Sequence, residues 1–261
     1  MSKVSDQTYL LTRQYNDGSR LAARGDLHER FSTNRTGWFP WLFDHLHLPE
    51  QARILELGCG PGWLWLRNMA RIPAGWDVTL SDFSEGMVHE AQRQLNGAPH
   101  SFTFNVVDAQ AIPYPSAGFD AVIANHMLYH VPDRPTALAE IRRVLKPGGH
   151  FYASTVGPGH LREMASFFPD YEDDFGAEYP FDLENGGEQL AVYFSHVERD
   201  RYDDALVVTE PEPLISYLLS TRVASSLDES ARDELVRRAE KAMIETGSVR
   251  ITKNVGLFGA W

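Results

Sequence analysis

A run of alternate glycines directly after an apolar segment constrains this chain more than any other feature of its sequence. Residues 53–57 are typical of a short buried strand, and Gly58, Gly60 and Gly62 follow at alternate positions. Glycine permits a tight turn and lets a ligand lie directly against the backbone, and a helix that follows presents unpaired N–H groups. In open α/β sheets, ligands bind at the carboxyl ends of strands. The sequence therefore predicts a ligand-binding turn at the start of an α/β unit.

Strand-like and helix-like segments alternate over the hundred residues that follow. The expected elements, in chain order, are a helix at 63–70, a strand at 77–81, a helix at 84–95, strands at 102–107 and 119–124, a helix at 135–145 and a strand at 149–155. This alternation predicts a parallel sheet with helices on both faces. Farther along, we expect strands at 192–199, 205–208 and 248–261, and helices at 213–221 and 230–246.

These patterns predict one structural domain with four parts. Residues 1–50 are expected to form a helical cover, 51–155 a ligand-binding core, 156–192 an inserted lid and 193–261 the C-terminal part of the sheet with its helices. The stretch 163–198 contains ten Asp or Glu residues, several aromatic residues and no Lys or Arg. An acidic, aromatic lid favours an acceptor that is not strongly anionic; a solvated acidic face with inward-turned aromatic residues is the alternative.

Composition excludes several classes of partner. Asp and Glu outnumber Lys and Arg by 36 to 24, for a formal net charge of −12, and such a chain repels phosphate backbones and anionic lipid. Cys59 is the single cysteine, so no intramolecular disulfide can form. The first residues lack a signal-peptide core, and no apolar run approaches the ~20 residues that span a bilayer. We expect a cytoplasmic protein that binds neither nucleic acid nor membrane; its oligomeric state is not indicated.

The glycine spacing separates two nucleotide cofactors. A dinucleotide fingerprint, G-x-G-x-x-G, would require glycine at position 63, where Trp63 would obstruct close packing of helix on strand. Asp82 follows the next strand and could accept both ribose hydroxyl protons; helix capping is the alternative, although Ser84 suits that role better. Asp108 and Ala109 end the third strand, where a carboxylate beside an amide suits an adenine edge, unless Asp108 is merely solvated.

Four segments at their observed spacing resemble the class I S-adenosylmethionine-dependent methyltransferases. They are ILELGCGPG (54–62), TLSDFSEGM (79–87), VVDAQAIPYPSAGFDAVIANHMLYHVPD (106–133) and ALAEIRRVLKPGGHFYAST (137–155). The subgroup that the chain resembles acts on small molecules, as do the ubiquinone and menaquinone biosynthesis methyltransferases. The resemblance implies a Rossmann-like, doubly wound α/β fold whose seven-stranded, mostly parallel sheet ends in a C-terminal antiparallel hairpin.

The resemblance also implies where S-adenosyl-L-methionine binds. The residues expected around its methionine and ribose end are Glu56, Gly58, Cys59, Gly60, Gly62 and Asn125. Those expected at the ribose hydroxyls and adenine are Asp82, Phe83, Met87, Asp108 and Ala109.

Three residues are candidates for the chemistry. His126 and His130 follow the fourth strand and could accept a proton from the acceptor, although His130 could instead pack under the turn at 131–133. Tyr15 could close the site with its aromatic face near the sulfonium, or simply anchor a surface helix. No metal site is expected, because the histidine pair lacks further ligands at a suitable spacing.

We therefore predict a methyltransferase that acts on O, N or C of a small organic acceptor by in-line displacement. A nicotinamide-dependent oxidoreductase and a non-catalytic S-adenosylmethionine-binding protein are the alternatives.

Overall fold

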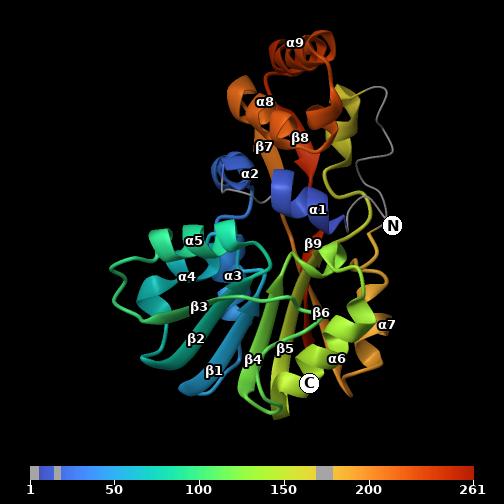
Figure 1. Ribbon diagram of the computed structural model, residues 1–261. Helices are drawn as coiled ribbons and strands as arrows, with labels where there is room; N and C mark the ends of the chain where they lie inside the picture. The colour runs from blue at the N-terminus through green and yellow to red at the C-terminus, as the bar shows by residue number, and fades with distance from the viewer. Residues whose placement is uncertain (1–5, 15–18, 169–178) are drawn as a thin grey trace.

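A computed structural model describes residues 6–14, 19–168 and 179–261 of the chain (Figure 1). Seven strands form the main sheet, in the order β3-β2-β1-β4-β5-β9-β6. Their bounds are β1 Gln51–Leu57, β2 Gly75–Asp82, β3 Phe102–Val106, β4 Phe119–Asn125, β5 Leu145–Val156, β6 Val197–Tyr202 and β9 Val255–Ala260. Strands β1 to β5 run parallel, whereas β9 runs antiparallel to both of its neighbours, β5 and β6.

Helices cover both faces of this sheet, as the alternation of segments predicts. On one face, α3 (Trp38–Asp44), α4 (Trp63–Leu66) and α5 (Glu85–Gln94) pack against the sheet residues of one core cluster. On the other face, α6 (Arg134–Val144) and α7 (Gly186–Ala191) complete a second cluster. The sequence order reverses between β1 and β4, so the glycine turn after β1 lies at the switch point where ligands bind in such sheets.

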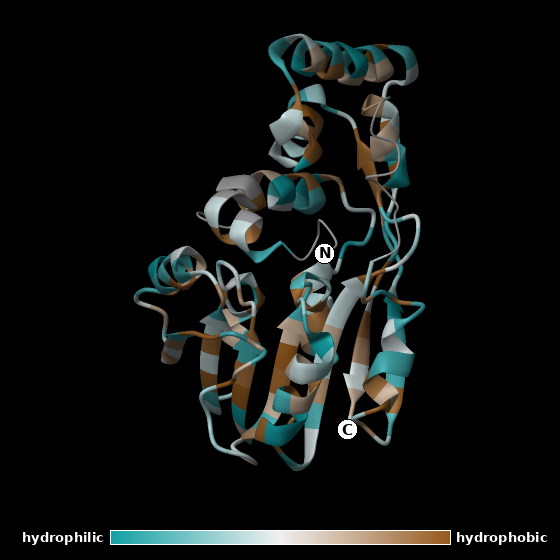
Figure 2. Ribbon diagram, turned by 45° about the vertical axis from the view of Figure 1, so that its right-hand side comes forward, coloured by the Kyte–Doolittle hydropathy of each residue, from teal (hydrophilic) through white to brown (hydrophobic). Residues whose placement is uncertain are grey.

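A separate cap stands above the carboxyl ends of the strands (Figure 1). Its elements are α2 (Ser19–Phe31), η5 (Arg162–Phe167), β7 (Ala205–Val208), α8 (Pro211–Ser220), η7 (Val223–Ser226), α9 (Glu229–Thr246) and β8 (Val249–Thr252). Strands β7 and β8 pair with each other and not with the main sheet, and the cap encloses its own hydrophobic cluster. Figure 2 shows hydrophobic residues both on the central strands and inside the cap. The short α1 (Gln7–Tyr9) and η2 (Leu10–Gln14) precede α2, and η3 (Met69–Arg71) and η4 (Leu128–His130) lie in the core.

The predicted fold class is confirmed: the sheet is seven-stranded and mostly parallel, and it ends in an antiparallel pair of strands. The two strands of that pair, β6 and β9, are not joined by a tight turn, because most of the cap lies between them in the chain.

Three element bounds were predicted wrongly. The expected strand 248–261 is two strands that break at Lys253 and Asn254, where the chain leaves the cap and enters the sheet. The expected strand 192–199 begins only at Val197, after α7, and the helix expected at 63–70 ends at Leu66. Among the helices in the described part of the chain, none is long and apolar enough to cross a membrane.

Candidate functional site

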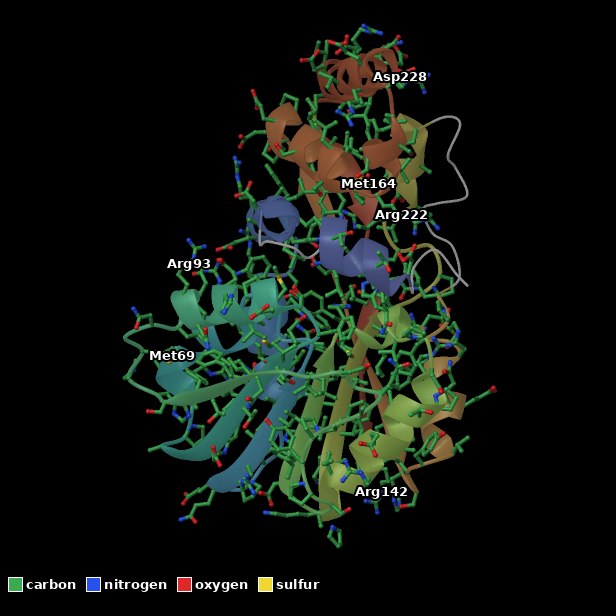
Figure 3. All side chains as sticks on the ribbon, in the orientation of Figure 1. Met69, Arg93, Arg142, Met164, Arg222 and Asp228 are labelled. Carbon is green, nitrogen blue, oxygen red and sulfur yellow. The ribbon has the colours of Figure 1, made fainter. Side chains whose placement is uncertain are left out.

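A large cleft separates the cap from the carboxyl end of the sheet. Its volume is about 1730 Å³, and residues of the glycine turn, the ends of β2 and β4, α2, α3 and the C-terminal cap segments line it. In Figure 3, Met164 and Arg222 belong to the cap, whereas Arg93 lies on α5 of the core. The cleft therefore joins the predicted cofactor turn to side chains that the cap supplies.

The glycine turn can form only because its alternate residues lack side chains. Gly58, Gly60 and Gly62 have φ values of 68°, 52° and 78°, which L side chains rarely adopt. A Cβ at Gly58 would lie 2.8 Å from the Cβ of Met127, whereas one at Gly60 would meet nothing nearer than 3.9 Å. Gly58 thus permits close packing inside the protein, and Gly60 leaves the backbone open to the cleft.

Asp82 ties the end of β2 to this turn. Its carboxylate accepts hydrogen bonds from the backbone N–H of Gly60 at 3.0 Å and of Ser84 at 2.8 Å. Burial raises the pKa of Asp82 to about 6. The helix α5 is capped by the Ser84 side chain, which accepts from the N–H of Met87, so the capping alternative for Asp82 does not apply. Each oxygen of Asp82 retains a lone pair for a ligand hydroxyl.

The far side of the turn offers a surface for a flat ring. Phe83 is 36% exposed and lines the cleft together with Met87 and Ala109. Asp108 also lines it, and its carboxylate accepts from the backbone and side-chain N–H groups of Gln110.

Two of the predicted cofactor residues do not line the cleft. Glu56 is 1% exposed and accepts a hydrogen bond of 2.6 Å from Trp65 Nε1 beneath the turn, where burial raises its pKa to about 8. At Gly62, an added Cβ would face Leu95 of the core at 3.0 Å. Both residues support the turn from inside, and their role toward a ligand stays a prediction.

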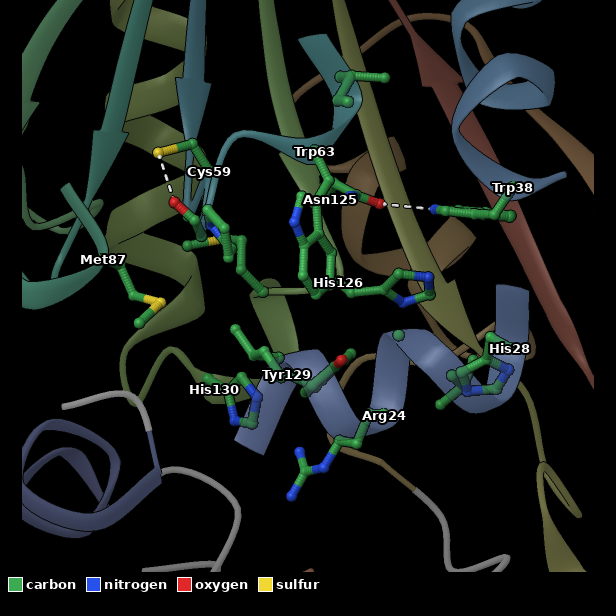
Figure 4. A pocket seen from close by; sticks show the side chains of 18 of the residues that line it. Arg24, His28, Trp38, Cys59, Trp63, Met87, Asn125, His126, Tyr129 and His130 are labelled. Atoms are coloured by element: carbon green, nitrogen blue, oxygen red, sulfur yellow. Dashed lines mark hydrogen bonds between the residues drawn. The ribbon is translucent and has the colours of Figure 1, made fainter. Parts of the chain in front are cut away.

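Asn125 ends β4 and His126 follows it directly, and both residues line the cleft (Figure 4). The side-chain oxygen of Asn125 accepts from Trp38 Nε1 at 3.2 Å and from the Ser154 hydroxyl at 2.7 Å. His126 has a φ of 55°, and its ring lies 5.0 Å from that of Trp38. Burial, with the positive charge of Lys253 as a smaller contribution, lowers the pKa of His126 to about 3. A histidine with so low a pKa is neutral at physiological pH and is a weak base.

Of the other two catalytic candidates, the structure describes His130 but not Tyr15. His130 lines the cleft, and its ring packs edge-on against Tyr129 at 4.5 Å. Tyr15 lies outside the described residues.

Several lining residues were not predicted from the sequence. Trp38 comes from α3, His28 and Arg24 from α2, His160 from the segment after β5, and Lys253 from the β8–β9 junction. No local motif marks them, because the cap brings together segments that are far apart in the chain. Trp63 lines the cleft, while Trp65 is fully buried in the core.

The residues present fit S-adenosylmethionine. The open backbone at Gly60, the carboxylate of Asp82 and the exposed ring of Phe83 all line the cleft, and they suit the amino-acid end, the ribose and the adenine of this cofactor. Of the predicted cofactor residues, those that line the cleft are Gly58, Cys59, Gly60, Asp82, Phe83, Met87, Asp108, Ala109 and Asn125.

Comparison with known proteins agrees with this geometry. Residues 55–153 match the family described as "Methyltransferase domain". The malonyl-[acyl-carrier protein] O-methyltransferase of Erwinia pyrifoliae is 35% identical over 125 residues, which cover 48% of this chain and 45% of that protein. The ubiquinone/menaquinone biosynthesis C-methyltransferase UbiE of Geobacter sulfurreducens is 35% identical over 149 residues, which cover 56% of this chain and 55% of that protein. The chain thus spans about half the length of these curated relatives.

A solved structure extends the similarity of fold to the whole chain. Phosphoethanolamine N-methyltransferase 2 of Haemonchus contortus, in complex with S-adenosyl-L-methionine, has a TM-score of 0.61 at 19% identity and covers 100% of this chain and 60% of that chain. The predicted resemblance is confirmed: residues 55–153 match a methyltransferase domain, the curated relatives are methyltransferases, and the solved structure of similar fold is a methyltransferase in complex with S-adenosyl-L-methionine.

Proposed function

We propose that this chain transfers a methyl group from S-adenosylmethionine to O, N or C of a small organic acceptor held between the core and the cap. The single observation that carries the proposal is the cleft itself, because it joins the glycine turn and Asp82 on one side to cap side chains on the other. A binding protein without an acceptor would not need this second wall.

In this proposal, the cofactor supplies a methyl carbon that the positive charge of its sulfur already activates. Asp82 and the glycine turn hold its sugar and amino-acid end, and Phe83, Asp108 and Ala109 hold its base. The cap then excludes water and aligns the acceptor, and such alignment can supply about 7–11 kcal/mol of the barrier reduction. We assign His126 a positioning role because of its low pKa, and we retain His130 as the candidate proton acceptor and Tyr15 as a candidate closing residue.

The remaining predictions belong to the same proposal. We propose 1–50 as a helical cover, 51–155 as the cofactor core, 156–192 as an acceptor lid and 193–261 as the end of the sheet with its cap helices. The net charge of −12 supports an enzyme that does not bind nucleic acid or membrane, and a single buried cysteine is compatible with the cytoplasm.

Radiolabelled methyl transfer tests this function. The purified protein is incubated with S-adenosylmethionine that carries the label on its methyl group and with fractionated small metabolites. We expect label in at least one fraction, and we expect the His130→Ala variant to transfer more slowly by a factor of about 10²–10⁴ if the acceptor must lose a proton. Cofactor binding without transfer to any fraction would favour the non-catalytic alternative.

A further inference from the structure

The carboxamide of Asn125 lies where three distant segments of the chain meet at the cleft. Asn125 ends β4 and lines the cleft together with Trp38 of α3. Its Oδ1 atom lies 3.2 Å from Trp38 Nε1, the bond drawn in Figure 4, and 2.7 Å from the hydroxyl oxygen of Ser154 on β5. The side chain is therefore held from two sides.

The chemistry of these partners determines which end of the carboxamide faces them. An indole Nε1–H can only donate, so the atom opposite Trp38 is the oxygen of Asn125, and the reverse orientation would set two N–H groups against each other. The Ser154 hydroxyl donates the second bond, and a carbonyl oxygen has two lone pairs. Both lone pairs of Oδ1 are thus in use, and the side chain has only the Nδ2 donors left to offer.

Ser154 is itself fixed by the backbone of the next residue, His126. Ser154 is fully buried, and its hydroxyl oxygen accepts from the backbone N–H of His126 at 2.9 Å. His126 has a φ of 55°, which a residue other than glycine keeps only where its surroundings enforce it. The ring of His126 also packs against that of Trp38 at 5.0 Å. The carboxamide cannot turn over without breaking this network.

The Nδ2 group of Asn125 is available to a ligand. Among the contacts of the described residues, its two N–H groups have no acceptor. Asn125 is half-buried and lines the cleft, so a molecule bound there would remove these N–H groups from water. A donor that loses water without gaining an acceptor weakens binding, and a ligand that fits this place supplies a lone pair.

The surroundings of the carboxamide favour the methyl acceptor as that ligand. In the sheet, β4 lies between β1 and β5. The predicted cofactor residues Gly60 and Asp82 belong to the ends of β1 and β2, whereas the side chain of Asn125 is tied to α3 and β5. The backbone of Asn125 can therefore meet the cofactor while its side chain serves the acceptor.

We propose that Asn125 determines acceptor specificity, because its Nδ2 group donates a hydrogen bond to a carbonyl or ether oxygen of the methyl acceptor. Trp38 and Ser154 are positioning residues that fix this orientation of the amide. A group that can only donate binds such an oxygen and disfavours a protonated amine, which would bring N–H against N–H. This inference rests on the proposed function, because it concerns the acceptor of the same reaction.

Two probes with one carbon skeleton test the inference on the wild-type protein. Isotope-labelled protein is saturated with S-adenosylhomocysteine and titrated, by NMR, with acetophenone, which offers a carbonyl oxygen, or with α-methylbenzylamine, which is protonated near neutral pH. We expect acetophenone to bind about threefold to tenfold more tightly, as one hydrogen bond allows, and to shift the side-chain amide signals of Asn125. Equal affinities, or no binding of either probe, would contradict the inference.

An isosteric variant exchanges the donor for an acceptor. Asn125→Asp keeps one oxygen for Trp38 and Ser154 and places a second oxygen where Nδ2 stands. We expect the preference to reverse, so that α-methylbenzylamine binds more tightly than acetophenone. A preference that stays as in the wild type would show that this side chain does not contact the ligand.

Trp38→Phe tests the positioning role without a change of charge. Phenylalanine keeps an aromatic ring but lacks the Nε1–H donor, so the carboxamide can turn over and the preference for acetophenone should fall toward equal affinities. The matched control is Trp76→Phe, which removes an indole bond of 2.9 Å to the Pro49 oxygen at the other end of the sheet and should leave the preference unchanged. The same preference in both variants would contradict the positioning role.

Binding of S-adenosylhomocysteine separates the two levels of the argument. If it does not bind to the wild type, the proposed function fails and this inference fails with it. If it binds and acetophenone is not preferred, only the present inference fails.

Discussion

Asp82 connects cofactor recognition to the shape of the glycine turn. Because its carboxylate accepts from Gly60 and Ser84, it both positions the turn and offers lone pairs to ribose hydroxyls. We predict that Asp82→Ala weakens S-adenosylhomocysteine binding by about 1–3 kcal/mol, the range for lost hydrogen bonds to a charged group. Calorimetric titration measures this change.

Asp77→Ala provides the control for that variant. Asp77 lies at the opposite end of β2, where its carboxylate pairs with Arg53 at an exposed site. We expect unchanged cofactor affinity in this control, and equal affinities for Asp77→Ala and Asp82→Ala would remove Asp82 from the site.

Glu56 makes stability depend on pH. Its carboxyl has a pKa of about 8 in the folded protein against a model value of 4.5, so the folded state binds this proton more tightly than the unfolded state. Stability is therefore lost as pH rises through this window. We predict that, between about pH 5 and about pH 8, the melting temperature falls more for the wild type than for Glu56→Gln. Each kcal/mol lost from the free energy of unfolding lowers the melting temperature by about 2–4 °C.

The exposed Glu50 provides the matched comparison for Glu56. Glu50→Gln should follow the wild-type pH profile in thermal unfolding. If Glu56→Gln follows it too, ionisation of Glu56 does not oppose folding.

The sequence predicted the positions of some site residues and not of others. Asp82, Asp108 and Asn125 could be placed because Asp82 and Asn125 end strands of a parallel sheet and Asp108 comes two residues after a third strand, and such ends meet at one edge. Glu56 was expected at the cofactor, but the same strand turns its side chain inward to Trp65. His28 and His160 could not be found, because the cap brings their distant segments together.

At the scale of elements, one buried ion pair joins the two connections between sheet and cap. Asp204 lies between β6 and β7, and Lys253 lies between β8 and β9. We predict that Asp204→Ala destabilises the protein by about 3–5 kcal/mol, because it leaves the Lys253 ammonium buried and unpaired. Urea unfolding measures the loss.

Neighbouring and compensating variants check this assignment. Asp203→Ala changes an exposed side chain and should alter stability by less than about 0.5 kcal/mol. The double variant Asp204→Ala/Lys253→Met should unfold at higher urea than Asp204→Ala, since no charge then remains unpaired. Identical unfolding of Asp203→Ala and Asp204→Ala would show that the pair does not hold the connections.

Elements of the core were easier to predict than those of the cap. Strands β1, β2 and β4 each contain a short apolar run, and helices separate β1 from β2, β2 from β3 and β4 from β5, so the alternation marks most of these strands in the sequence. The break between β8 and β9 has no such signal. Residues 248–261 form one continuous strand-like stretch, and only the pairing of β8 with β7 and of β9 with β5 and β6 divides it.

The whole molecule combines a core, formed largely by one continuous stretch of the chain, with a cap built from separate segments. The core carries the motifs that predict the cofactor and the family, whereas the cap and its connections to the sheet supply the opposite wall of the cleft. The overall charge of −12 is a property of the whole chain, whereas the cleft is lined by both basic residues, such as Arg24, and acidic residues, such as Asp82.

Calorimetric titration of the purified chain with S-adenosylhomocysteine and, separately, with NADH tests the central claim most directly. We predict one saturable site for S-adenosylhomocysteine, weakened in Asp82→Ala and unchanged in Asp77→Ala, and no saturable site for NADH. Saturable binding of NADH without binding of S-adenosylhomocysteine would contradict the account.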